Sequence, residues 1–186
     1  MLLVKPASEH LSSYVAALER GWSPDKLRSE ASLEELCEIR RSPEAFLAAL
    51  DDREAQGKPI LLPDGSTVPR LPGFRRFMWD DEFCGSIGLR WQPGTPALPE
   101  TCLGHIGYAV VPWKRRRGYA TQALAQLLPE AKILGLPYVE LTTEPDNLAS
   151  QRVILANGGV FVESFFAPRF HGGDETLRFR IPLMSS

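Results

Sequence analysis

The sequence lacks several features that define common classes of protein. No apolar stretch approaches the roughly 20 residues that span a bilayer, so we expect neither a transmembrane helix nor a membrane partner. Neither the G-x-x-x-x-G-K-[ST] phosphate loop nor the G-x-G-x-x-G dinucleotide fingerprint is present. The usual sites for nucleoside triphosphates and dinucleotides are therefore not indicated.

Cysteine is scarce, with only Cys37, Cys84 and Cys102 among 186 residues. They are odd in number, lack C-x-x-C spacing and follow no signal peptide. We therefore expect no disulfide framework, no bound metal and a reduced, cytoplasmic compartment. Each cysteine is interpreted as a structural residue and not as a nucleophile.

Charge of one sign is also missing, because 21 basic residues face 23 acidic residues and the net charge is −2. Such a balance creates no global field that attracts nucleic acid or an anionic membrane. A weaker hypothesis, salt-dependent nucleic-acid binding, rests on the local basic run at residues 114–117. The length and the 44% hydrophobic content predict one globular domain over residues 1–186.

The most informative segment is residues 104–121. A β-prone run ends at Pro112, four consecutive cations and Gly118 follow, and apolar residues then recur at helical spacing from Thr121. The first turn of a helix leaves about four N–H groups without partners, and glycine lets a ligand approach them closely. This pattern predicts a phosphate site for an adenine nucleotide or coenzyme A. The alternative is a solvated basic loop.

The segment Val110-Val111-Pro112-x-x-Arg115-x-x-Gly118-x-Ala120 resembles the acyl-CoA signature of the GNAT N-acetyltransferase superfamily. Downstream, Asn147-x-x-Ser150 and Asn157-Gly158-Gly159 are similar to the second half of that family's core. The resemblance spans roughly residues 74–182. It implies an acetyl-CoA-dependent transfer of an acetyl group to a primary amine by direct attack in a ternary complex. The acceptor would be a small molecule or a peptide, and the protein a possible homodimer.

The resemblance further implies a mixed α/β fold whose sheet is mostly antiparallel, with one splayed parallel pair and helices on both faces. The residues themselves predict a helical N-terminal block at 1–56, a Pro/Gly-rich connector at 57–73 and a core at 74–182. A helix joins the predicted strands 103–111 and 138–143, which favours a parallel pair with a right-handed crossover.

Local signals refine this outline at five places. The β-rich runs 74–79 and 83–91 are parted by Asp80-Asp81-Glu82, which predicts an antiparallel hairpin. Ser32 with Glu35 is typical of a capping box, and Ser42 before Pro43 is typical of a helix start. Asp64-Gly65 favours a hairpin turn. Pro129, inside an apolar helical stripe, predicts a kink near Ala125 or a broken helix, because proline removes a backbone donor.

The resemblance assigns the cofactor-binding residues. The cationic turn would hold the pyrophosphate through backbone N–H groups, with Val110 and Val111 pairing with the pantetheine arm. Asn147 and Ser150 would also contact the cofactor, although both residues are equally typical of a helix cap. The turn residues are Arg115, Arg116, Arg117, Gly118, Tyr119, Ala120 and Thr121.

The general acid is unassigned, because Ile154 stands where many relatives have the tyrosine that protonates the departing thiolate. Tyr108, Tyr119 or water are the alternatives. Ile154 also motivates a second hypothesis, a non-catalytic acyl-CoA sensor or interaction module.

Three residues are candidate bases for an amine substrate. His105 lies on the signature strand and has an ordinary pKa of about 6.5, close to neutral pH. Glu140 and Glu144 lie on or just after the next predicted strand. For each residue a purely structural or solvated role is the alternative.

Overall fold

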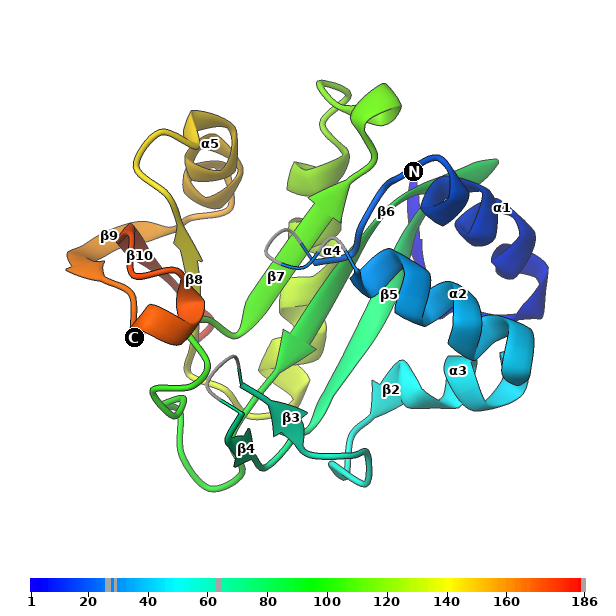
Figure 1. The fold of residues 1–186 in the computed structure, drawn as a ribbon. Coiled ribbons are helices and arrows are strands. Elements are labelled where there is room, and N and C mark those ends of the chain that lie inside the picture. Colours follow the sequence, from blue (N-terminus) through cyan, green and yellow to red (C-terminus); the bar gives the residue numbers. More distant parts are fainter. Residues whose placement is uncertain (26–27, 29, 63–64, 185–186) are drawn as a thin grey trace.

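The computed structural model describes residues 1–25, 28, 30–62 and 65–184. Figure 1 shows a large sheet, a smaller sheet beside it and helices on both sides. The N-terminal elements are β1 (Leu2–Val4), α1 (Ser8–Glu19), α2 (Ala31–Arg41), α3 (Pro43–Ala49), β2 (Asp51–Asp52), β3 (Ile60–Leu61) and β4 (Thr67–Val68). The core elements are β5 (Gly73–Asp80), β6 (Glu82–Arg90), β7 (Ile106–Val110), η1 (Pro112–Lys114), α4 (Tyr119–Ile133), β8 (Tyr138–Thr143), α5 (Leu148–Ala156), β9 (Val160–Phe166), η2 (Arg169–His171) and β10 (Glu175–Pro182).

The larger sheet has the order β1-β5-β6-β7, with β2 also paired to β5. The smaller sheet has the order β8-β10-β9, and both sheets are antiparallel throughout their described ladders. The β5–β6 hairpin confirms the prediction of two β-rich runs parted by Asp80-Asp81-Glu82. Asp81 has the positive φ of 61° that this tight turn requires.

The two sheets meet at the beginning of β7 and β8. The backbone N–H of His105 donates to the carbonyl of Glu140 at 2.7 Å. Among the described residues, no ladder joins β7 to β8 beyond this contact, so the strands belong to separate sheets. The parallel splayed pair expected of them therefore stays a prediction.

Two apolar clusters fill the two sides of the larger sheet, with α1, α2 and α3 on one side and α4 on the other (Figure 1). This arrangement confirms the expected helices on both faces. The α4 side buries Leu124 and Leu127 together with Val139 and Phe179 of the smaller sheet. The same cluster therefore holds the two sheets together.

The local helix signals had different outcomes. Ser42 caps α3 as predicted, since its hydroxyl accepts a hydrogen bond from Ala45 N at 3.2 Å with Pro43 at the first helical position. The capping box at Ser32 and Glu35 is wrong, because α2 already begins at Ala31. The Glu35 carboxylate instead contacts the buried Tyr14 hydroxyl of α1 and the Arg75 guanidinium of β5.

The two predictions that rested on prolines also had different outcomes. The 57–73 connector forms the predicted hairpin, β3 against β4, although Asp64 of its predicted turn lies outside the described residues. The predicted break at Pro129 is wrong, because α4 continues unbroken through it. The lost hydrogen bond costs about 3 kcal/mol, and the burial of Leu124, Leu127 and Ala131 on this helix offsets it.

Candidate functional site

The first turn of α4 presents free backbone donors. Gly118 is its N-cap in the left-handed conformation, with φ of 74°, and no side chain caps the helix. The first intrahelical bond runs from Gln122 N to Gly118 O at 3.0 Å, so the N–H groups of the preceding three residues point out of the helix. A Cβ at Gly118 would meet only Gln122 Nε2, at 3.6 Å. The space in front of this helix end is open.

Two side chains of this turn are anchored to the β5–β6 hairpin, and three arginines are exposed. Lys114 is ion-paired with Glu82 at 2.5 Å, and this hydrogen bond raises the pKa of Lys114. The Tyr119 hydroxyl donates to Asp80, which lowers the pKa of that carboxyl group. Both contacts tie the turn to the β5–β6 hairpin. Arg115, Arg116 and Arg117 remain exposed and supply the positive charge.

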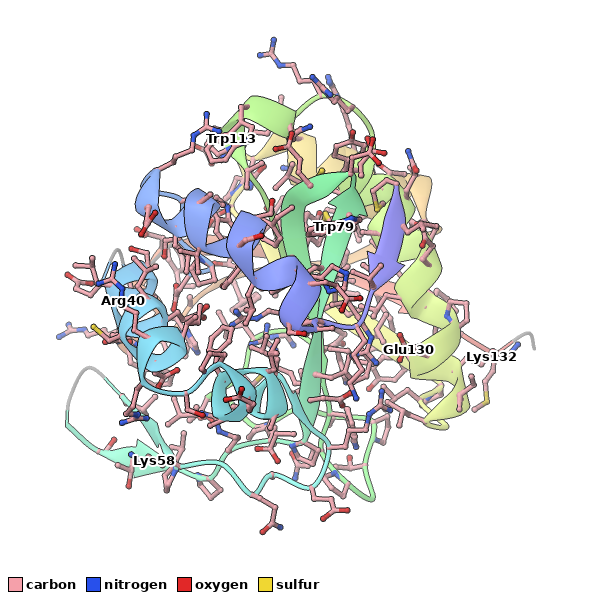
Figure 2. All side chains as sticks on the ribbon, turned by 90° about the vertical axis from the view of Figure 1, so that its right-hand side faces the viewer. Arg40, Lys58, Trp79, Trp113, Glu130 and Lys132 are labelled. Atoms are coloured by element: carbon pink, nitrogen blue, oxygen red, sulfur yellow. The ribbon has the colours of Figure 1, made fainter. Side chains whose placement is uncertain are left out.

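A further contact fixes the chain just before the turn. Trp113 lies over the end of α1, where the Arg20 guanidinium stacks 3.7 Å from its ring centre (Figure 2). The phosphate-binding turn (residues 114–121) is therefore held from both sides, by α1 and by the β5–β6 hairpin. A preorganised turn loses little entropy when it binds an anion.

One edge of β7 faces away from β6. His105 O accepts from Arg90 N, and Val111 N donates to Cys84 O, so residues of odd number direct their backbone groups toward β6. The backbone groups of Tyr108 and Val110 consequently point to the open edge. Val110 O is approached there by Arg115 Nε at 3.4 Å. Val110 thus faces the open edge, whereas the N–H of Val111 is already bound.

Tyr108 connects β7 to the start of α5. Its hydroxyl lies 2.8 Å from Ser150 Oγ and 3.3 Å from the Ser150 carbonyl. Burial raises the pKa of Tyr108 to about 12. Asn147 is the N-cap of α5 and accepts from Ser150 N at 3.1 Å, so both polar residues have structural contacts as well. The structure thereby brings together two site residues that lie 42 positions apart.

Ile154, for which the family resemblance implied a tyrosine, is buried in the core. A Cβ at Gly159 would lie 2.4 Å from Ile154 Cγ2, so the helix stop is packed directly against this side chain. No hydroxyl is available here. The Tyr108 phenol contacts this helix at Ser150, which lies one turn before Ile154.

His105 is fully buried at the junction of the two sheets. Its Nδ1 accepts the backbone N–H of Glu140 at 3.0 Å, and its Nε2 has no hydrogen-bond partner among the described residues. Burial lowers the pKa of His105, against the opposing influence of the Glu140 carboxylate. The neutral ring carries its proton on Nε2, and its one lone pair is used. This geometry does not favour proton abstraction by His105.

The two carboxylates of β8 have different surroundings. Glu140 is buried and receives two hydrogen bonds on Oε1 from Arg180, at 3.2 and 2.6 Å. Glu144 follows the end of β8, is exposed and accepts from Asn147 Nδ2 at 3.4 Å. Alternation along the strand places the Glu140 side chain on the face opposite Val139 and Leu141 of the core, and Glu144 directly follows Thr143, the last residue of β8.

On that face lies a cavity of about 260 Å³ that the sequence did not reveal. We call it the arginine pocket; its walls are the segment 97–103 and the side chains of Tyr138, Glu140, Arg178 and Arg180. The only sequence signal was the pair of arginines two residues apart in the last strand. A second wall from a remote proline-rich connector carried no signal.

Comparisons with known proteins identify the class. The family model described as "Acetyltransferase (GNAT) domain" matches residues 26–160, which is more than half of the chain. The chain therefore belongs to the GNAT acetyltransferase family, and it is an acyltransferase. A comparison with curated protein sequences gives no match.

Solved structures share the fold at low sequence identity. RimJ from Mycobacterium smegmatis in complex with CoA-disulfide is 16% identical, with a TM-score of 0.64 over 97% of this chain and 80% of that one. The microcin C7 self-immunity acetyltransferase MccE, in complex with acetyl-CoA and AMP, is 11% identical, with a TM-score of 0.60 over 97% and 91%. A spermidine N-acetyltransferase SpeG variant from Vibrio cholerae is 14% identical, with a TM-score of 0.59 over 98% and 95%. Within the described residues, no helix is long and apolar enough to cross a bilayer.

Proposed function

We propose that this protein transfers the acetyl group of acetyl-CoA to a primary amine, by direct attack within a ternary complex. One observation carries the proposal: the uncapped start of α4, with Gly118 at φ of 74°, stands beside the open edge of β7. Three exposed arginines add positive charge there. Backbone donors, cations and a free strand edge suit the pyrophosphate and the amide-bearing pantetheine arm of coenzyme A.

The chain's own residues have four tasks in this reaction. The phosphate-binding turn binds and orients the cofactor, and the N–H of Val110 contacts the pantetheine arm. Acetyl-CoA supplies an activated thioester when bound. The amine nitrogen attacks the carbonyl carbon, the carbon–sulfur bond breaks, and Tyr108 donates its phenolic proton to the sulfur that leaves. The proton that the nitrogen loses as it becomes an amide returns through solvent to the Tyr108 phenolate. A pKa of about 12 keeps this phenol protonated at neutral pH.

The attacking amine must first lose a proton, because an alkyl ammonium has a pKa of about 10.4. We assign this step to Glu144, whose exposed carboxylate directly follows the end of β8. Glu140 is less suitable because Arg180 binds it. His105 is assigned a structural role, since the one lone pair of its neutral ring accepts a hydrogen bond from a backbone N–H.

Two measurements test the function. Calorimetry with acetyl-CoA and desulfo-CoA should give saturable binding of both at micromolar protein. A panel of amines, assayed by release of free thiol, should then identify acceptors. An absence of binding by either cofactor contradicts the proposal at its first step.

A second function, the acyl-CoA sensor, is favoured by one observation, the buried Ile154 at the position of the expected tyrosine. Binding of acetyl-CoA without turnover of any amine would support the sensor over the enzyme. A loss of residual turnover in a Tyr108 variant would support the enzyme.

A further inference from the structure

The arginine pocket lies on the face of the smaller sheet that is turned away from α4. Val139 and Phe179 pack into the core with α4, so the alternate residues of β8 and β10 point to the opposite side. Glu140 pairs with Arg180 across the two strands, and Thr142 pairs with Arg178. The pocket is therefore on the face of Glu140 and Thr142, next to the strand end that Glu144 follows.

The walls of the pocket are fixed by long-range contacts. The imidazole of His171 in η2 lies 3.1 Å from the carbonyl of Thr101, which ties the 97–103 segment to the β9–β10 connection. Arg180 stacks on the Tyr138 ring at 3.9 Å and binds Glu140, so its guanidinium has a set orientation. Arg178 similarly stacks on Phe165 at 4.6 Å.

The two arginines of the pocket have unused hydrogen-bond donors, although the nearby carboxylates of Glu140 and Glu163 balance their charge. Arg178 Nη1 lies 3.1 Å from Glu163, an exposed carboxylate, and 4.0 Å from Glu140. Its Nε is buried and has no hydrogen-bond partner among the described residues. Buried donors of this kind are rarely left unpaired in native proteins. Arg180 uses only Nε and Nη2 on Glu140, so one edge of each guanidinium remains for a ligand.

The size and charge of the site select the ligand. A planar group with one negative charge matches the free edge of a guanidinium in a bidentate manner. The carboxylates of Glu100 and Glu140 also line the pocket, and they oppose a phosphate dianion more strongly than they oppose a monoanion. Arg178 lies opposite Thr142, two residues before Glu144, which is about 7 Å at the rise of a strand.

We propose that the arginine pocket binds a carboxylate of the acceptor, with Arg178 as the specificity residue, so that the acceptor is an amine that carries a carboxylate within a few bonds. This inference rests on the proposed function for the role of the bound molecule. The amine then lies near Glu144 and the open edge of β7, and the carboxylate lies at Arg178.

The test compares two ligands that differ only in the carboxylate. N-acetylglycine and N-acetylglycinamide are titrated into the full chain by calorimetry in the presence of coenzyme A. We expect the carboxylate to bind roughly 10- to 100-fold more tightly than the amide, as a charged hydrogen bond provides. Arg178→Gln should make the two affinities equal, and Arg178→Lys should restore part of the difference.

Two further variants control for folding and for the location of the site. Arg41→Gln, on the exposed end of α2, removes the same charge elsewhere and should keep the preference. Ala97→Phe adds bulk at an exposed position of the pocket wall and should weaken both ligands. Arg180 is not used, because its loss would leave the buried Glu140 unpaired.

The outcomes separate this inference from the proposed function. Equal binding of the two ligands by the unmodified protein, or an unchanged preference in Arg178→Gln, overturns the carboxylate assignment even if amines are acetylated. Stronger competition by inorganic phosphate than by acetate overturns it in favour of a phosphate ligand. A carboxylate preference lost in Arg178→Gln supports the pocket even if no amine is turned over.

Discussion

The phosphate-binding turn and the arginine pocket differ in how the chain builds them. The turn is made from consecutive residues, and its donors are backbone N–H groups at the start of α4. The pocket is made from three remote segments, and its donors are the side chains of Arg178 and Arg180. One site depends on a local conformation, and the other depends on the meeting of two sheets.

This difference explains why the two sites constrain function so differently. Backbone donors recognise a phosphate in any chain that folds into the same turn, so a family can keep its cofactor while its sequence changes. Side-chain donors change with single substitutions, so the acceptor can differ between relatives of one fold. MccE and RimJ share the fold with this chain at 11% and 16% identity.

The largest expected effect tests whether the turn acts through its backbone. Gly118→Glu places a negative charge in the phosphate cradle and a side chain at φ of 74°, so acetyl-CoA binding by calorimetry should fall at least roughly 100-fold. The matched control is Gly135→Glu at the other end of α4, where φ is 79° and a Cβ meets nothing within 4 Å. Equal losses in both variants would contradict a specific cradle.

The next effect tests the strand end next to the arginine pocket. Glu144→Gln keeps the size of the side chain and removes its basicity, so kcat should fall roughly 100-fold with little change in the Kd of acetyl-CoA. Glu38→Gln, an exposed carboxylate on α2, is the control and should retain kcat. If Glu144→Gln is as active as the unmodified protein, the base is elsewhere.

A smaller effect tests the contact between β7 and α5. Tyr108→Phe removes the proposed proton donor, and kcat should fall by roughly 10-fold or more with thiol release as the measurement, because water partly replaces the phenol. Tyr14→Phe is the control, since that buried hydroxyl binds Glu35 on the opposite side of the larger sheet. Burial raises the pKa of Tyr108 to about 12, so native stability should decline between pH 10 and 12 in the unmodified protein. The variant should lack that alkaline decline.

The sequence predicted structural features that depend on neighbouring residues, and it missed features that depend on contacts between distant segments. The β5–β6 hairpin, the Ser42 cap and the turn at Gly118 each follow from neighbouring residues, and the structure has all three. The Ser32–Glu35 box failed because Glu35 contacts Tyr14 and Arg75, and a buried hydrogen-bond network outweighs one helix cap. The helix through Pro129 likewise reflects burial that no local rule contains.

The candidate site follows the same rule. The cofactor residues were predicted because the turn is contiguous, whereas the buried state of His105 depends on the approach of β8, 35 positions away. Arg178 and Arg180 gave only a weak signal, as a pair two residues apart, because their significance comes from Glu140 on a neighbouring strand and from the 97–103 segment. A residue's chemistry at a junction between sheets is set by partners that the sequence does not place.

The smallest expected effect concerns His105, which lies at the junction of the two sheets. His105→Asn keeps an acceptor for the Glu140 N–H and removes the titrating ring. Because burial lowers the pKa of His105, the unfolded chain binds a proton near pH 6.5 while the folded chain does not. The stability that depends on His105 is therefore complete above about pH 7 and is lost as pH falls below 6.5.

Urea unfolding at several pH values measures this loss. The difference in unfolding free energy between the unmodified protein and His105→Asn should be about 1 to 3 kcal/mol at pH 8 and should shrink steadily below pH 6.5. His10→Asn is the control, because His10 also accepts a backbone N–H, from Ala7 at 3.0 Å, but near the surface, where water still reaches the ring. The same samples should show a nearly unchanged kcat for His105→Asn. A kcat lowered roughly 100-fold, with a difference in stability that does not vary with pH, would instead make His105 the base and remove that role from Glu144.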